Sequence, residues 1–326
     1  MKLVCSLFAV LLFIASSSLG AAVKWHTDYP QVRALSQQEN KPALLFFNGS
    51  DWSGEAMWMK REVLSTAPFE KKIISRFICM EVDFPEHSTL SHQETVQNQD
   101  LKNRFKIQET PTLLLLDAQE RVIAQICYLP ENGDRFADDL LKLLEQDALL
   151  VKGLSNLDQN ATQLRALYQI AQELGRVPAQ EQILEAGLKT EDPHFFLEKY
   201  RLLVARGERE QATARTLRAK LSSLDPENSR GVHFTLALID FQDLSQKAQN
   251  PDVAVEPLVA YLDRFGQTDL NNLWRVEMMI AQHYMEADVQ EKALKHAEKA
   301  LQAAPDKMHD EIAHSLDYIR ATSVHQ

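Results

Sequence analysis

Hydrophobic and polar residues follow different patterns in the two halves of the chain. Ala43–Phe47 is a continuous apolar run, which is typical of a strand covered on both faces. Three further apolar runs predict strands at Ile78–Val82, Leu113–Leu116 and Val122–Tyr128. From Ser155 onward the chain shows helical stripes separated by Gly and Pro, without a strand-like run. The pattern predicts an α/β domain over residues 21–150 and an all-α domain over residues 151–326.

The segments between the predicted strands have the spacing of helices. A helix is expected to begin at Ser65–Pro68, where hydroxyl side chains precede a proline of the first turn. The polar stretch Pro85–Gln99 is predicted as a loop that leads into a short helix at Leu101–Phe105. A long amphipathic helix is expected around Phe136–Leu144. The predicted order is therefore βαβ followed by ββα.

The first twenty residues have the pattern of a secretory signal. Lys2 precedes an apolar segment from Leu3 to Ala15, and small residues around Gly20 are suited to cleavage. The apolar segment is shorter than the roughly 20 residues that span a bilayer. A retained anchor is the alternative, but no flanking charge cluster supports it. Residues 1–20 are predicted as a signal peptide, and the mature protein as periplasmic or otherwise exported, without a membrane span.

The charge of the chain argues against polyanionic partners. Asp and Glu number 46 against 35 Lys and Arg, and the formal net charge is −11. The basic residues are not clustered, which argues against binding of nucleic acid or anionic lipid.

The turn after the first predicted strand carries the most specific motif. It reads Gly49-Ser50-Asp51-Trp52, followed by Ser53-Gly54-Glu55-Ala56. Four other features accompany it: Trp25, Lys41-Pro42, Val82-Asp83 and Thr110-Pro111-Thr112. Together they resemble a thioredoxin-like domain of the exported kind, in which Trp-Cys-x-x-Cys follows Gly-Ser-Asp. The resemblance implies a central mixed sheet flanked by helices, with Pro111 as the cis-proline that faces the turn.

Two departures from the family pattern bear directly on its chemistry. Ser53 and Ala56 occupy the positions of the two cysteines, and Phe47 occupies that of the buried acid. Thiol–disulfide exchange needs an attacking thiolate and a second thiol to resolve the mixed disulfide. We therefore predict no redox activity and no catalytic residue at the turn. Ser53 is expected to cap the following helix; the alternative, a serine nucleophile, lacks a histidine base nearby in the sequence.

Polypeptide binding is the activity that the altered turn retains. Trp52, Met57 and Trp58 place adaptable aromatic and thioether side chains at the start of the helix. The resemblance implies that Thr110, before Pro111, offers its backbone to an extended partner strand. These five residues form the predicted peptide-binding site. The alternative is that the helix turns its apolar side chains to the sheet and leaves only the Trp52 ring exposed.

No metal or cofactor is predicted, and the thiols are expected to be structural. His87 and His92 lie in the polar stretch without a recognised ligand spacing, so a solvated loop is favoured over a metal site. The mature chain keeps only Cys79 and Cys127. In a thioredoxin-like sheet their strands are too far apart for a disulfide, which needs Cα atoms within about 7 Å. Two buried free thiols are predicted, with a disulfide as the alternative.

The C-terminal half resembles a tetratricopeptide-like helical domain. The clearest unit is marked by Ala281, Tyr284, Ala293, Ala297, Ala300 and Pro305. Weaker copies end at Pro226 and Pro193. Stacked helix pairs share a core and expose a concave surface that commonly binds a partner. The alternative is a helical domain that only packs against the N-terminal part.

These observations lead to two functional hypotheses. The first is a redox-inactive exported protein that binds or scaffolds polypeptides during protein folding or envelope assembly. The alternative is an enzyme of the thiol–disulfide oxidoreductase or isomerase lineage, which acts through Cys79 or Cys127 or with a redox partner.

Overall fold

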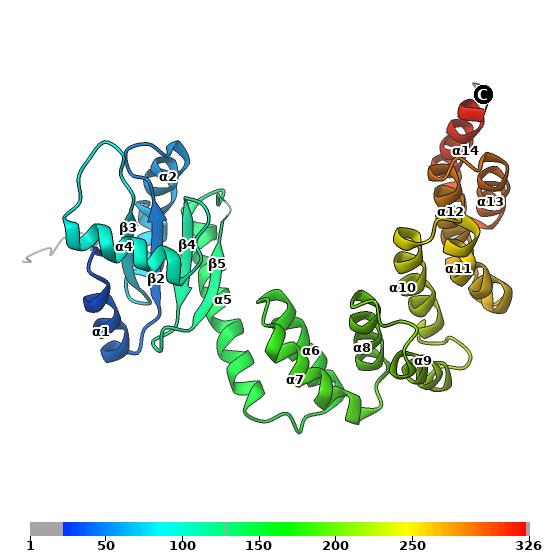
Figure 1. The fold of residues 1–326 in the computed structure, drawn as a ribbon, viewed down its shortest axis with the longest axis horizontal. Coiled ribbons are helices and arrows are strands. Elements are labelled where there is room, and N and C mark those ends of the chain that lie inside the picture. Colours follow the sequence, from blue (N-terminus) through cyan, green and yellow to red (C-terminus); the bar gives the residue numbers. More distant parts are fainter. Residues whose placement is uncertain (1–21, 128, 324–326) are drawn as a thin grey trace, which may run out of the picture. The chain divides into compact units, whose positions relative to one another are not determined.

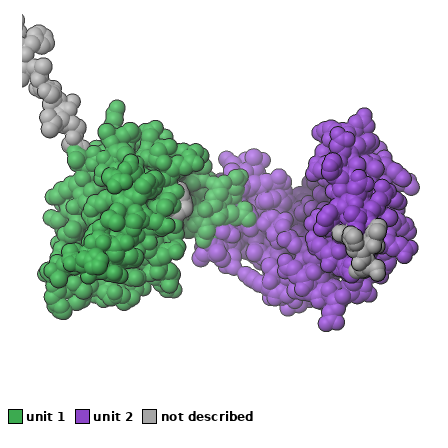
Figure 2. Space-filling model, turned by 90° about the horizontal axis from the view of Figure 1, so that it is seen from above, with its two compact units in different colours: residues 1–155, 169–176 green, residues 156–168, 177–326 purple. Residues whose placement is uncertain are grey.

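The computed structural model describes residues 22–127 and 129–323. It divides into two compact units, which Figure 2 shows in different colours. The sheet unit comprises the chain up to Ser155 together with Gln169–Arg176, and the helical unit comprises Asn156–Tyr168 and the chain from Val177 onward. The predicted signal peptide, residues 1–20, lies outside the described residues. Within the described ranges, helices that combine the length and apolar character of a membrane span are absent.

The sheet unit is built on a five-stranded mixed sheet, four strands of which the sequence predicts (Figure 1). The strands are β1 (Trp25–His26), β2 (Ala43–Asn48), β3 (Ile78–Asp83), β4 (Thr112–Leu116) and β5 (Val122–Ile126). Their order is β1-β3-β2-β4-β5; β3 runs parallel to β1 and β2, and β4 runs antiparallel to β2 and β5. The short edge strand β1 was not predicted.

Helices cover both faces of this sheet. They are α1 (Tyr29–Glu39), α2 (Gly54–Met59), α3 (Ala67–Ile73), α4 (His92–Arg104) and α5 (Gly133–Leu154), and a π-helical turn (Lys60–Leu64) follows α2. Because side chains alternate along a strand, Leu44 and Phe46 of β2 join one core cluster, which includes Phe136 of α5. Leu45 and Phe47 join the other, with residues of α1 and α4. Both faces of β2 are buried, which explains its continuous apolar run.

One sequence prediction about a helix start is wrong, and a second is confirmed in its position but not in its cap. The polar stretch 85–99 is helical from His92 onward, because Ser91 and Glu94 form a capping box across the first turn of α4. Helix α3 begins at Ala67 after Thr66, but the Thr66 hydroxyl does not cap it. That hydroxyl donates to the Val63 carbonyl at 2.7 Å instead.

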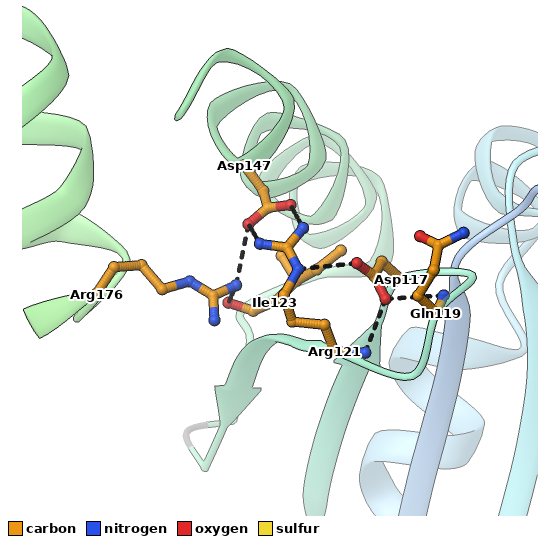
Figure 3. A network of polar contacts seen from close by, with 6 residues as sticks. All are labelled: Asp117, Gln119, Arg121, Ile123, Asp147 and Arg176. Carbon is orange, nitrogen blue, oxygen red and sulfur yellow. Dashed lines mark hydrogen bonds and ion pairs between the residues drawn. The ribbon is translucent and has the colours of Figure 1, made fainter. Parts of the chain in front are cut away.

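A polar network closes the sheet unit at the end where β4 finishes and β5 begins (Figure 3). The Asp147 carboxylate of α5 accepts from Arg121 Nη2 at 2.7 Å and from Arg176 Nη2 at 2.9 Å. Arg121 Nε also donates to Asp117 Oδ2 at 2.9 Å, and Arg176 Nη2 to the Ile123 carbonyl at 3.4 Å. The network attaches Gln169–Arg176 to the sheet unit, although that segment lies far along the chain.

The rest of the described chain is helical, as predicted. The helices are α6 (Ala161–Glu173), α7 (Val177–Gly187), α8 (Pro193–Ala205), α9 (Ala212–Leu224), α10 (Val232–Lys247), α11 (Pro251–Phe265), α12 (Leu270–Glu286), α13 (Gln290–Ala303) and α14 (His309–Ser323). Consecutive helices pack as pairs: α8 with α9, α10 with α11, and α12 with α13. In the last pair, Ala281 of α12 and Ala293 and Ala297 of α13 are fully buried in one core cluster.

Candidate functional site

The candidate site lies at the opposite end of the sheet, where β2 finishes and β4 begins. Phe47 of β2 pairs with Thr112, the first residue of β4. The turn that follows β2 and the Thr110–Pro111 loop that precedes β4 therefore leave the sheet at the same end, here called the turn end. The Thr110–Pro111 peptide bond is cis, Pro111 is buried and Thr110 is half-buried.

Ser53 caps helix α2, as the sequence predicts. Its Oγ accepts a hydrogen bond from the Ala56 backbone N–H at 3.3 Å. The Ala56 methyl group belongs to the core cluster beneath the helix and is 1% exposed. The two positions at which the thioredoxin resemblance places cysteines thus hold a capping hydroxyl and a buried methyl group.

Asp51 anchors a second loop onto the turn. Its carboxylate accepts backbone N–H bonds from Glu86 and His87, each 2.8 Å long, and from Ser88 at 2.7 Å. Partial desolvation raises the pKa of Asp51, but these three donors outweigh it and lower the pKa to about 2. The carboxylate is therefore ionised at any physiological pH and holds the loop after β3.

Two further contacts fix the turn to the end of β3. Ser50 donates from its backbone N–H and its hydroxyl to Asp83, at 2.9 and 2.5 Å. Trp52 Nε1 donates to the Phe84 carbonyl at 2.7 Å. The indole lies so close to Gly49 that a Cβ there would be 2.4 Å from a ring carbon, so the turn needs glycine at this position.

The structure separates the apolar side chains of the turn and α2 into two groups. Trp52 and Met57 are each 44% exposed. Met59 is fully buried, and Trp58 is half-buried and packs against the core of the sheet unit. Of the side chains predicted to bind peptide, Trp52 and Met57 are thus free for a partner, and Trp58 is mainly structural.

A polar cluster that the sequence did not reveal lies beside the turn. Asn48 Nδ2 donates to Glu81 Oε1 at 2.8 Å, and Lys60 Nζ forms an ion pair with the same oxygen at 2.5 Å. Asn48 begins an Asn-Gly-Ser sequence of the kind that accepts N-linked sugars, but it is 1% exposed and therefore closed to glycosylation in the folded chain. Phe47, at the family's buried-acid position, is fully buried in apolar surroundings.

The two thiols have different environments. Both are free, and Cys79 is buried, which raises its pKa to about 12. The prediction that Cys127 is also buried is wrong. Strand β5 ends at Ile126, which packs in the core, so the next side chain points away from it. Cys127 Sγ lies 3.7 Å from Thr112 Oγ1, which places this exposed thiol at the turn end.

His87 and His92 are not brought together with other metal ligands. Across residues 22–127 and 129–323, the structure gathers no three His, Cys, Asp or Glu side chains that would hold a metal ion. His87 contributes its backbone N–H to Asp51, and His92 is the first residue of α4.

Comparison with known proteins agrees with this geometry. Residues 29–143 match a family model described as a thioredoxin-like domain. The chain is 37% identical over 309 residues to the thioredoxin-related protein DsbJ of Chlamydia pneumoniae, covering 93% of this chain and 89% of DsbJ. It is 28% identical over 125 residues to the disulfide bond reductase DsbH of Chlamydia pneumoniae, covering 38% of this chain and 75% of DsbH. A solved structure of the DsbH oxidoreductase shares 26% identity at a TM-score of 0.38, covering 42% of this chain and 95% of that one.

Proposed function

The chain belongs to the family of the thioredoxin-related protein DsbJ, and from this premise we propose an exported thioredoxin-like protein that binds polypeptides without exchanging thiols at its turn. The observation that carries the proposal is the chemistry of two positions. Ser53 supplies a hydroxyl already engaged as a helix cap, and Ala56 supplies a buried methyl group. Neither group forms the mixed disulfide on which exchange depends.

The turn end is well suited to binding. Trp52 is exposed, but its indole is held by the Phe84 carbonyl and rests against Gly49. An ordered aromatic side chain loses little conformational entropy when a partner covers it, so more of the contact energy contributes to affinity. Met57 adds an exposed, adaptable thioether on the first turns of α2. The protein is accordingly proposed to hold or scaffold polypeptides during folding or envelope assembly.

The test is binding of an unfolded polypeptide to the full mature chain. The probe is fluorescently labelled α-lactalbumin that has been reduced and alkylated, so that it neither folds nor offers thiols. We expect Trp52→Ala/Met57→Ala to weaken binding roughly tenfold, because buried aromatic anchors dominate such interfaces. The matched control removes two exposed apolar side chains of the helical unit, Val253→Ala/Leu270→Ala, and should leave the affinity unchanged.

Two results would contradict the proposal. One is an affinity that both double variants change equally. The other is catalytic reduction of insulin disulfides by the wild-type chain that is lost when Cys79 or Cys127 is replaced, because the chain would then act by thiol exchange.

A second candidate function rests on the exposed thiol of Cys127. DsbH is named as a disulfide bond reductase, and Cys127 lies at the turn end beside Thr112. Its thiolate would attack one sulfur of a client disulfide, forming a mixed disulfide as the client S–S bond breaks and the other client sulfur leaves as a thiolate. A client thiolate that then attacks the mixed disulfide would release Cys127 and leave the client rearranged. Cys79 is too buried for this reaction.

Thiol trapping in cells separates the two candidates. The second candidate predicts mixed-disulfide adducts that disappear in Cys127→Ser and persist in the matched variant Cys79→Ser. The absence of adducts in the wild-type chain supports binding without exchange.

A further inference from the structure

The helical unit contains a recess with an apolar floor and a cationic rim. It lies among α9, α10 and α11 and has a volume of about 230 Å³. Leu236, Tyr261 and Phe265 contribute to its floor, and Arg218 and Arg264 to its rim. None of the described side chains that line it is acidic, although the chain as a whole carries a net charge of −11.

The charge on this rim is only partly compensated. Arg218 forms an ion pair with Asp240, whose carboxylate is fully buried behind the recess. Arg264 donates to the Pro226 carbonyl at 3.3 Å, and its guanidinium lies 4.7 Å from the centre of the Phe265 ring. Among residues 22–127 and 129–323, no carboxylate forms an ion pair with Arg264. Its guanidinium therefore keeps a full positive charge at the mouth of an apolar recess.

His233 lines the recess without adding charge. Its ring lies 4.7 Å from the Phe265 ring, and its Nε2 is buried without a hydrogen-bond partner among the described residues. Burial lowers the pKa of His233, and the charge of Arg264 lowers it further. The imidazole is therefore neutral at pH 7, and the arginines alone set the sign of the potential.

The recess continues into a second one. Arg218, Pro257 and Ala260 line both, and the second has a volume of about 250 Å³. Glu210, Asp240 and Glu256 also line the second recess, so only the first is free of acidic side chains among its described lining. A ligand carboxylate is therefore expected in the first recess, and only uncharged parts of a longer ligand would extend into the second.

We infer that this recess binds an apolar polypeptide segment through a carboxylate, with the carboxylate on Arg264 and Arg218 and an apolar side chain on the floor. A guanidinium presents paired N–H donors that match the two oxygens of a carboxylate, and such bonds are stronger than neutral ones. The apolar floor excludes water from one side of the contact and selects a large aliphatic or aromatic neighbour. This inference goes beyond the proposed function, because it places a separate polypeptide site in the helical unit.

The test compares two labelled, acetylated and amidated octapeptides on the full mature chain by fluorescence anisotropy. One alternates Leu with Glu, and the other alternates Leu with Gln. We expect the Glu peptide to bind more tightly, and Arg264→Gln to weaken its binding about tenfold. Ala260→Trp, which fills the recess without changing its charge, should weaken binding similarly. A Leu–Gln peptide with a free C-terminus distinguishes a chain-terminal carboxylate from a side-chain one, and binding of either supports the inference.

The matched control is Arg275→Gln. Arg275 lies over an aromatic ring as Arg264 does, 4.9 Å from the centre of the Trp274 ring, but does not line the recess. The inference is overturned if the blocked Gln peptide binds as tightly as both the blocked Glu peptide and the Gln peptide with a free C-terminus, or if Arg264→Gln and Arg275→Gln cause equal losses. An unchanged affinity in Ala260→Trp would do the same, and this variant stays informative if loss of Arg264 disturbs folding. Trp52→Ala/Met57→Ala should leave peptide binding intact, which separates this site from the turn end.

Discussion

The sheet unit and the helical unit use their carboxylates in different ways. In the sheet unit, single carboxylates collect several donors at the two ends of the sheet: Asp51 holds a loop at the turn end, and Asp147 holds two arginines at the other. In the helical unit, a carboxylate that gathers several donors does so within one turn of the chain, as Asp225 does with Ser229, Arg230 and Val232. Contacts between its helices instead pair a carboxylate with a tyrosine and a basic side chain. Tyr200 donates to Asp240 at 2.6 Å and Tyr284 to Asp252 at 2.8 Å.

This difference indicates which polar contacts point to a functional site. The strand order fixes which segments meet at each end of a sheet. A carboxylate that accepts backbone N–H groups there therefore marks a loop held in one conformation. In a helical array, a recurring tyrosine–carboxylate bond sets the packing of neighbouring helices and singles out no site. The binding face of the helical unit should therefore be sought at charged side chains that form no ion pair among the described residues, such as Arg264.

The largest effect is expected at the carboxylate with two arginines. Asp147→Ala should lower the free energy of unfolding of the sheet unit by about 3 kcal/mol, because it leaves Arg121 and Arg176 without their shared, buried partner. Hydrogen exchange of the β4 and β5 amides measures the change. Asp138→Ala, which breaks an exposed ion pair with Lys72, is the control and should cost about 0.5 kcal/mol. Similar losses in the two variants would show that the network is not what stabilises this end of the sheet.

A packing constraint of the helical unit gives the next effect. A Cβ on Gly187 would lie 2.3 Å from ring carbons of Phe195, which is fully buried. We expect Gly187→Ala to destabilise the helical unit by about 2 kcal/mol, as overpacking does, measured by hydrogen exchange of α7 and α8. The control is Gly54→Ala in the sheet unit, where a Cβ meets nothing within 4 Å. A neutral Gly187→Ala would mean that α7 and α8 separate more easily than their contacts imply.

A smaller effect is expected at the altered redox position. Ser53→Ala removes the side-chain cap of α2 and should cost about 1 kcal/mol, while Ser53→Thr should retain most of the stability. The exchange rate of the Ala56 amide, which donates to Ser53, reports the loss directly. An unchanged rate would show that Ser53 does not stabilise α2 as a cap, and a chemical role for its hydroxyl would then be open to test.

The smallest effect is a pH dependence confined to the turn end. The pKa of Asp51 is about 2 in the folded chain, below its ordinary value of 3.8. The stabilisation is therefore complete above about pH 4 and is lost as the pH falls through about 2. Amide chemical shifts of Glu86, His87 and Ser88 should move together across this range. They should not do so in Asp51→Asn, and a transition at higher pH would assign the effect to another group.

The buried strands were predictable because their continuous runs of apolar side chains are stable only in the core. Ala43–Phe47 became β2 almost residue for residue. Strand β1 has only two residues, Trp25 and His26, and so few positions show no periodicity. The first turns of α4 are polar, which hid the helix, although the Ser91…Glu94 pair was a readable start signal.

The candidate site was predictable only where the residue type at a given position determines its role. The loss of both sulfurs and the Ser53 cap follow from residue types at fixed positions in a turn. The donors that bind Asp51 are backbone N–H groups, which any residue supplies, so the sequence carries no trace of them. The exposure of Cys127 depended on where β5 ends, and strand ends are set by pairing partners rather than by local composition.

The ion pair of Arg176 with Asp147 has a consequence for how this protein is dissected. The change from an α/β to an all-α pattern in the sequence falls at residue 150. A fragment that ends there would stop inside α5 and lose Arg176, one of the two cations that neutralise Asp147. An N-terminal fragment that keeps every residue of the sheet unit instead runs to residue 176. Studies that assign binding to one half or the other should divide the chain after that arginine.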